Sequence, residues 1–270
     1  MIKKTLDTIK SNPKVLLVFT AAILIMSFGV SLITLKFTGT ALTPAALNYD
    51  QIRGLLSDFL VYLGILLIFA LAATTLVWPA LGNYIHEMCT GKLEKGWYIR
   101  GLKKSWWKVP LLALIIIAIT AVAFIFLALI FAYVLRAALI SLLLNLALTM
   151  TISVFSIIAL TAVFTEDEFS YALGNVFSLG GSYFFKLLGV AVLVYLPFFL
   201  ISLLFSYITN AIGIVIDNFS VMYFIMQAVN IIYSAAAAVF ILTYSMHRYL
   251  DERSIYYPPV FIEEEQQSQG

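Results

Sequence analysis

Long apolar stretches alternate with short polar segments over most of this sequence. A helix rises about 1.5 Å per residue, so about 20 apolar residues are needed to cross a hydrocarbon layer of about 30 Å. Six stretches are long enough, and each is expected to be a transmembrane helix. They are approximately residues 14–35, 55–78, 109–133, 138–164, 184–207 and 220–244. The spacing predicts an all-α, polytopic membrane bundle within residues 1–250, followed by a polar tail over 251–270.

Composition agrees with a chain that lies mostly in lipid. Of the 270 residues, 63% are hydrophobic and 11% are charged, whereas a soluble domain carries about 25% charged residues. A water-soluble fold with this composition lacks the polar groups to cover its apolar surface. The single cysteine, Cys89, excludes an internal disulfide.

Lysine and arginine residues lie mainly on one side of the predicted bundle. If the N-terminus is on the inner side, only Lys36, Arg53 and Arg136 fall on the outer side. The other thirteen are Lys3, Lys4, Lys10, Lys14, Lys92, Lys95, Arg100, Lys103, Lys104, Lys108, Lys186, Arg248 and Arg253. Because cytoplasmic loops are enriched in Lys and Arg, both termini are predicted to be cytoplasmic.

A short amphipathic helix is expected at the N-terminus. Ile2, Leu6 and Ile9 are spaced as one face of a helix, with lysines flanking them. Asn12 and Pro13 are residue types favoured at the N-cap and at the first helical position, so the first span is expected to begin there.

The two longer inner connections share an order of residue types, in which a helical stripe is followed by a serine, aromatic residues and a lysine. The stripes are Tyr98, Leu102, Ser105 and Trp106, before Lys108, and Phe169, Leu173, Val176 and Phe177, before Lys186. The second stripe is expected to end at Gly180-Gly181, which would break the chain before the fifth span. The similarity favours a duplicated unit of span, interfacial helix and span. The alternative is that any basic and aromatic membrane border has this composition.

Three short motifs are spread along the chain: Ile9 to Pro13; Glu168 with Tyr171 to Leu173 and Phe177 to Leu179; and Tyr244, Arg248 and Asp251. They resemble a bacterial superfamily of six-helix membrane proteins related to the membrane domain of glycerophosphoryl diester phosphodiesterases. The resemblance covers nearly the whole chain and implies a six-helix fold in a bacterial cytoplasmic membrane. In the fused members the phosphodiesterase chemistry belongs to a separate soluble domain that is not in this sequence. The resemblance therefore implies a fold rather than an activity.

No catalytic, metal or cofactor site is predicted. His86-Glu87-Met88-Cys89-Thr90 begins like a zinc-protease helix, but threonine stands where that motif requires its second histidine. A metal site formed by His86, Cys89 and the distant His247 is the remaining alternative, although these residues follow no structural-zinc spacing. The sequence has neither a Gly-x-Ser-x-Gly elbow nor a phosphate-binding glycine loop. We therefore expect that the protein is not an enzyme.

Polar groups inside the predicted spans are few. No Asp, Glu, Lys, Arg or His lies near the middle of any span, whereas ion-coupled transporters usually keep one there. The polar candidates are Asn145, Gln227, Asn230 and Ser234. Such groups more often join helices by hydrogen bonds than line a substrate path. They leave a transporter or export component for an amphipathic or lipid-like substrate as the alternative function.

The inner loop between the second and third spans has the strongest functional pattern. Six cations fall within the 17 residues from Lys92 to Lys108, interleaved with aromatic residues. Beside an anionic leaflet such a segment gains about 1 kcal/mol per charge, and tryptophans fix its depth. The candidate head-group residues are Arg100, Lys103, Lys104, Trp106, Trp107, Lys108 and Lys186. Topology determination alone requires the same charges, so both interpretations stay open.

The leading functional hypothesis is a non-enzymatic scaffold or accessory protein that engages anionic lipids of the inner leaflet or a partner complex. A protein partner would dock on the cytoplasmic face or on the polar tail, which is expected to lack fixed structure. Nucleic acid is not an expected partner, because the basic residues are held against the bilayer.

Overall fold

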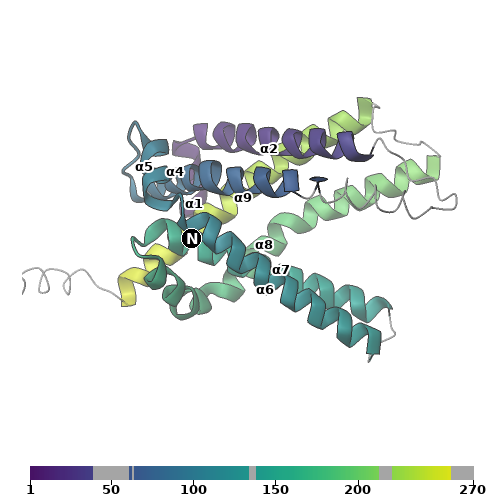
Figure 1. Ribbon diagram of the computed structural model, residues 1–270. Helices are drawn as coiled ribbons and strands as arrows, with labels where there is room; N and C mark the ends of the chain where they lie inside the picture. Colours follow the sequence, from purple (N-terminus) through teal and green to yellow (C-terminus); the bar gives the residue numbers. More distant parts are fainter. Residues whose placement is uncertain (39–60, 63, 134–137, 213–220, 257–270) are drawn as a thin grey trace, which may run out of the picture.

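The computed structural model describes residues 1–38, 61–62, 64–133, 138–212 and 221–256. All regular structure in these ranges is helical (Figure 1), which confirms the predicted all-α class. The elements are α1 (Ile2–Ser11), α2 (Lys14–Thr38), the π-helix η1 (Ala73–Val77), α4 (Trp78–Thr90), α5 (Trp97–Ser105), α6 (Lys108–Tyr133), α7 (Ala138–Thr165), α8 (Phe169–Ile212) and α9 (Val221–Tyr256).

Five described helices are long and apolar enough to cross a membrane, as expected for a multi-pass membrane protein. These spans are Gly64–Thr90, Lys108–Leu127, Leu144–Thr165, Phe169–Pro197 and Ala228–Tyr256. A sixth is counted if α1 and the first part of α2 are taken as one broken span, although these two helices meet at an angle of 87°. The predicted number of six corresponds to this second count.

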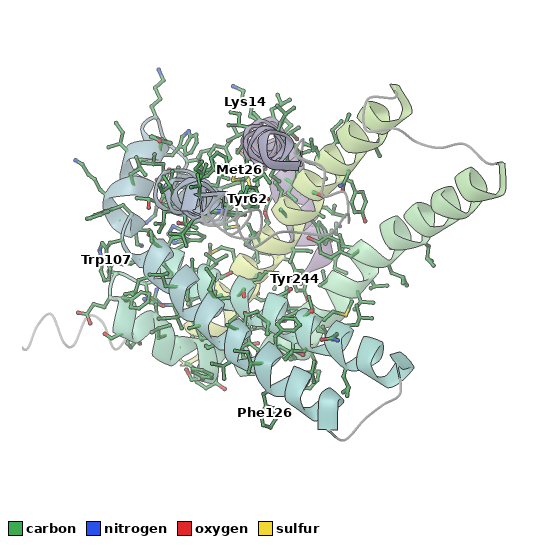
Figure 2. All side chains as sticks on the ribbon, turned by 45° about the vertical axis from the view of Figure 1, so that its right-hand side comes forward. Lys14, Met26, Tyr62, Trp107, Phe126 and Tyr244 are labelled. Atoms are coloured by element: carbon green, nitrogen blue, oxygen red, sulfur yellow. The ribbon has the colours of Figure 1, made fainter. Side chains whose placement is uncertain are left out.

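The helices pack most closely at the end of the molecule that contains α1 and α5 (Figure 1). The N-terminal parts of α2 and α8, the C-terminal parts of α7 and α9, and α4 supply most of the buried core. Away from this end, α6 and α7 run together and diverge from α2, and Phe126 of α6 points outward (Figure 2). Exposed apolar side chains of this kind suit a surface that meets acyl chains.

Two helices continue beyond their predicted ends. The second span was predicted to end at residue 78, but the helix continues through η1 and α4 to Thr90. Gly91 then adopts a left-handed conformation, with φ of 70°, and ends α4 as a C-cap. Helix α9 continues to Tyr256, so the first six residues of the predicted polar tail are helical. Residues 257–270 lie outside the described part of the chain.

The two inner connections have different structures, which weakens the inference of a duplicated unit. Helix α5 is separate from α6, and a turn joins them. In the second connection α8 runs without interruption through Gly180-Gly181, so the break predicted there is wrong. A Cβ atom at Gly180 would lie 2.5 Å from Cγ2 of Ile158 in α7. The glycine therefore permits close packing of α8 on α7, in the way that small residues bring membrane helices together.

Candidate functional site

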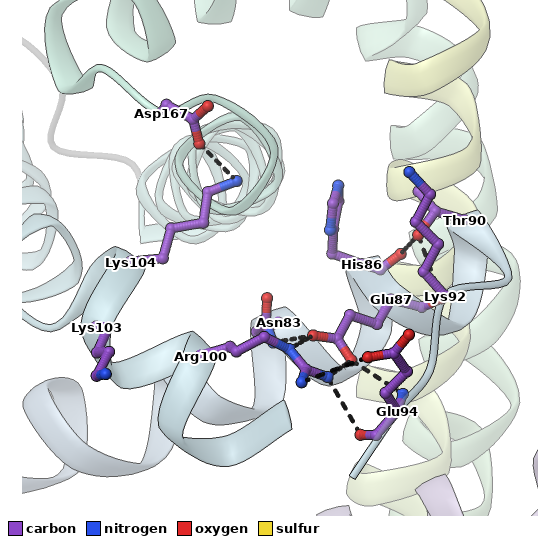
Figure 3. A pocket seen from close by; sticks show the side chains of 10 residues that line it. All are labelled: Asn83, His86, Glu87, Thr90, Lys92, Glu94, Arg100, Lys103, Lys104 and Asp167. Carbon is purple, nitrogen blue, oxygen red and sulfur yellow. Dashed lines mark hydrogen bonds and ion pairs between the residues drawn. The ribbon is translucent and has the colours of Figure 1, made fainter. Parts of the chain in front are cut away.

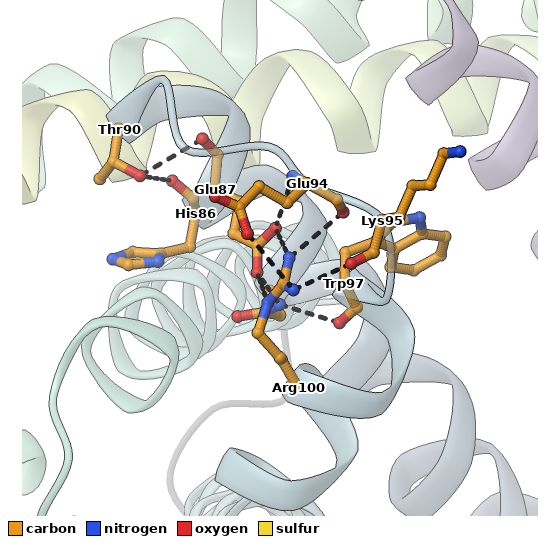
Figure 4. Close-up of polar contacts among 8 residues, drawn as sticks. His86, Glu87, Thr90, Glu94, Lys95, Trp97 and Arg100 are labelled. Atoms are coloured by element: carbon orange, nitrogen blue, oxygen red, sulfur yellow. Dashed lines mark hydrogen bonds and ion pairs between the residues drawn. The ribbon is translucent and has the colours of Figure 1, made fainter.

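Glu87 is a buried carboxylate near the end of α4. Its side chain is 9% exposed, and it accepts hydrogen bonds of 2.7 Å from Nε and 2.7 Å from Nη2 of Arg100 in α5 (Figure 4). Asn83, one turn earlier, donates to the same carboxylate at 2.8 Å. A bidentate pair fixes the relative orientation of its two groups, so it holds α5 in a defined position on α4. The hydrogen bonds between Arg100 and Glu87 also raise the pKa of the Arg100 guanidinium.

A close approach of the two backbones makes this ion pair possible. Gly101 of α5 faces α4, where a Cβ atom would lie 2.6 Å from the carbonyl oxygen of Pro79. Trp97 packs edge-on against Tyr84, with 4.8 Å between the ring centroids. The carbonyl oxygen of Trp97 accepts a hydrogen bond of 2.9 Å from Asn83. Helix α5 is therefore held by one glycine contact, one aromatic contact and a polar network.

Glu166 is a second buried carboxylate, between α7 and α8. Its side chain is 4% exposed. The Tyr249 hydroxyl donates to Oε1 at 2.9 Å, and Nη2 of Arg253 donates to Oε2 at 3.1 Å. Both partners lie near the C-terminal end of α9, so these contacts join that end to the α7–α8 junction. Removing one partner of such a pair leaves a buried charge uncompensated, which is costly.

Two of the predicted head-group lysines cap the end of α7. Lys108 is 3% exposed, and its Nζ donates to the carbonyl oxygens of Glu166, at 3.2 Å, and of Asp167. Lys104 donates to the carbonyl oxygen of Thr165 at 3.1 Å and pairs with the Asp167 carboxylate at 3.1 Å. The last carbonyl groups of a helix have no partner within the helix, and cations there also complement the helix dipole. The hydrogen bond from Lys104 holds the pKa of the Asp167 carboxyl below its usual range.

The remaining head-group candidates are more accessible than these two lysines, but Arg100, although 43% exposed, is committed to the ion pair with Glu87 of α4. Trp106 and Trp107, in the turn after α5, are 55% and 44% exposed. Lys103 on α5 and Lys186 inside α8 are also exposed, and neither forms an ion pair within the described residues. The seven candidates thus separate into three that connect helices and four whose side chains face outward.

An open pocket of about 620 Å³ lies between α4, α5 and the α7–α8 junction (Figure 3). It is lined by Asn83, His86, Glu87, Thr90, Lys92, Glu94, Arg100, Lys103, Lys104 and Asp167. In Figure 3 the His86 ring and the ammonium groups of Lys92 and Lys104 point into the same space, and the Glu87–Arg100 pair forms another wall. The pocket therefore offers N–H donors and positive charge from separate segments of the chain.

The predicted intramembrane polar residues are only partly described. Asn230 and Ser234 lie one turn apart on α9 and share a hydrogen bond of 3.3 Å. Asn145 is half-buried on α7 and has no hydrogen bond to either of them among the described contacts. The side chain of Gln227 lies outside the described residues. The contact that joins two of the four is thus within one helix, and it defines no substrate path.

The alternative metal site gains no support from the geometry. Nε2 of His247 lies 3.0 Å from the Thr8 hydroxyl oxygen, and Cys89 is a partly buried free thiol on α4. In the ranges that the structure describes, no three His, Cys, Asp or Glu side chains are grouped so that they could hold a metal ion.

The two carboxylate clusters were not predicted from the sequence. The available signal was that Glu87 and Glu166 each stand beside a long apolar run, where a carboxylate is stable only with a partner. Their partners were not identifiable, because Arg100 is 13 residues from Glu87 and Arg253 is 87 residues from Glu166. Only the packing of the helices selects these arginines from the others at the same end.

Comparison with protein-family models, with curated proteins and with solved structures gives no match. The resemblance to the six-helix bacterial superfamily therefore stays a prediction.

Proposed function

We propose that this chain is a non-enzymatic protein of the bacterial cytoplasmic membrane. Its cationic end, which is the end that contains α1, α5 and the loop before α5, holds anionic lipids of the inner leaflet. The observation that supports the proposal is the exposure of ammonium groups without ion pairs, and of two tryptophans, in the segment that contains α5. Lys92, Lys95 and Lys103 are exposed and form no ion pair within the described residues. Trp106 and Trp107, in the turn after α5, are exposed as well.

The positive charge of the lysines and the preference of tryptophan for the head-group level of a bilayer together favour a lipid surface as the partner. Each ammonium group near an anionic leaflet gains about 1 kcal/mol, and indole rings prefer the level of the head groups. Helix α1 adds the exposed Lys3 and Lys10, and its Ile2 and Leu6 are 49% and 42% exposed. A helix with such a composition lies in the membrane surface.

In the alternative interpretation, the same charges serve only to set the topology, and they act while the helices insert. A lipid-binding surface must act in the folded protein. The two interpretations are therefore separated by measuring lipid retention on protein that has already inserted and folded.

The test replaces Lys92, Lys95 and Lys103 together with glutamine. Lys104 and Lys108 stay unchanged, because they cap α7. Native mass spectrometry of the purified protein then counts bound phosphatidylglycerol against phosphatidylcholine. Three charges at about 1 kcal/mol each predict a preference for the anionic lipid that is lower by up to about 100-fold.

The matched control replaces the same three lysines with arginine, which keeps the charge and should retain the lipid. An unchanged preference in the glutamine variant would contradict the proposal, because it would show that these three exposed ammonium groups do not hold the lipid.

A further inference from the structure

We propose that the pocket between α4, α5 and the α7–α8 junction binds a phosphate group, either of an anionic phospholipid or of a soluble phosphate compound. The inference rests on the proposed function, because it places one anionic group at a defined position on the same cationic end. It goes further by requiring a saturable site, which a diffuse cationic surface does not provide.

Donors from three segments meet at this pocket. His86 lies on α4, Lys92 in the loop that follows it, and Lys104 on α5. Figure 3 shows the imidazole ring and both ammonium groups pointing into one space. A phosphate group has several acceptor oxygens that point in different directions, and lysines bind it as point charges. The volume of about 620 Å³ leaves room for the rest of a head group.

The side of the pocket that carries Lys92 and Lys104 is its positive side. Lys92 forms no ion pair within the described residues. Lys104 is balanced by Asp167 at 3.1 Å, but the Asp167 side chain is 92% exposed. It can therefore turn into water while a phosphate oxygen takes its place beside Lys104. This exchange keeps the number of charge-assisted hydrogen bonds to Lys104 unchanged.

The wall around Arg100 is negative, because one guanidinium is shared between two carboxylates. Glu87 lies 2.7 Å and Glu94 3.9 Å from Arg100. These carboxylates repel an anion, so the ligand is expected on the side of Lys92 and Lys104. Over the whole lining, four Lys and Arg side chains face three carboxylates, which leaves a surplus of one positive charge.

The test measures binding to the full-length protein in a neutral detergent, with inorganic phosphate and dihexanoyl phosphatidylglycerol as probes. Saturable binding of at least one probe is expected. Lys92→Gln should weaken it by about tenfold, because one charge-assisted hydrogen bond is lost. Lys14→Gln is the control: Lys14 is exposed at the start of α2, does not line the pocket and is not one of the three lysines of the proposed lipid surface. Its replacement should leave the affinity unchanged.

Asp167→Asn gives a second readout of opposite sign. It releases Lys104 from its ion pair, so the affinity for phosphate should increase. A gain of affinity cannot come from loss of folding, so this variant tests the site even if Lys92→Gln is poorly folded. Unchanged or weaker binding by Asp167→Asn would count against the proposal.

The two probes separate the two sources of the phosphate. Binding of inorganic phosphate in competition with the lipid assigns the site to a soluble phosphate compound, and binding of the lipid alone assigns it to a head group. Equal losses in Lys92→Gln and Lys14→Gln, or no saturable binding of either probe, would overturn the inference. In that case a loss of lipid from the triple glutamine variant would still support the proposed function, so the two failures are distinguishable.

Discussion

Glu87 and Glu166 each meet an arginine from another part of the chain, at the end where most of the buried core lies. A carboxylate with little access to water needs a charged or hydrogen-bonding partner to stay ionised. The arginines themselves, Arg100 and Arg253, are 43% and 41% exposed. Solvent therefore screens these pairs in part, and each contributes less than a fully buried pair would.

Replacement of Glu87 with glutamine tests this description at the level of one residue. The charged acceptor of Arg100 is lost, so the free energy of unfolding should fall by about 1–3 kcal/mol. Glu94→Gln is the control, because Glu94 is 77% exposed and 3.9 Å from Arg100, and should cost less than about 1 kcal/mol. Unfolding in detergent, followed by circular dichroism, measures both. Equal effects would show that the burial of Glu87 is not the cause.

Single residues are also where the sequence predicted least. The seven head-group candidates were chosen as one class, because lysines and aromatic residues at a membrane border look alike in a sequence. The structure separates Lys108, buried against the carbonyl groups that follow α7, from Lys103, which is exposed. This difference depends on where α7 ends in space relative to α6. Spacing along the chain contains no such information.

Among the helices, the sequence predicted best where apolar runs stop abruptly. Helices α6 and α7 begin and end within one residue of their predicted bounds. The helix that ends in α4 was predicted too short, because its last turns carry Asn83 and Glu87, which bond to each other and to Trp97 and Arg100 of α5. Helix α8 was predicted to break at Gly180-Gly181, where close packing against α7 instead uses a glycine. Hydropathy does not register either kind of tertiary contact.

The docking of α5 on α4 predicts a specific glycine effect. Gly101→Ala would place a methyl group 2.6 Å from the Pro79 carbonyl oxygen, and a backbone atom cannot move aside as a side chain can. The expected loss is about 1–3 kcal/mol of unfolding free energy. Gly174→Ala is the control, because no atom lies within 4 Å of the added carbon. In that helix alanine should stabilise by up to about 1 kcal/mol. Thermal unfolding in detergent compares them, and a neutral Gly101→Ala would contradict the close contact.

For the whole molecule, the ion pair between Lys4 of α1 and Asp251 of α9, at 3.2 Å, places both ends of the described chain on the same side. Helix α5, with its lysines, lies at that end as well (Figure 1). A count of five to six spans and the gathering of lysines at one end were predictable, because both depend on sums over many residues. The side of the membrane that this end faces is predicted only from the enrichment of Lys and Arg in cytoplasmic loops.

Orientation can be tested with one accessible thiol. In a Cys89→Ser background, Lys95→Cys places the cysteine at an exposed position of the loop before α5. A membrane-impermeant maleimide should leave this thiol unlabelled in intact cells and label it after the membrane is opened, because the cationic end is predicted to face the cytoplasm. Labelling of intact cells would reverse the orientation and remove the inner leaflet as the lipid partner.

The contact between α1 and α9 also constrains biogenesis. Lys4 and Asp251 are 247 residues apart, and a ribosome adds about 5–20 residues per second. Of these two helices α1 emerges first, and it must therefore wait on the order of tens of seconds for α9. During that time the ammonium group of Lys4 lacks the carboxylate with which it pairs in the folded protein. We therefore expect α1 to pack on α9 only after α9 has been made, so an N-terminal fusion should interfere with this packing rather than with insertion of the spans.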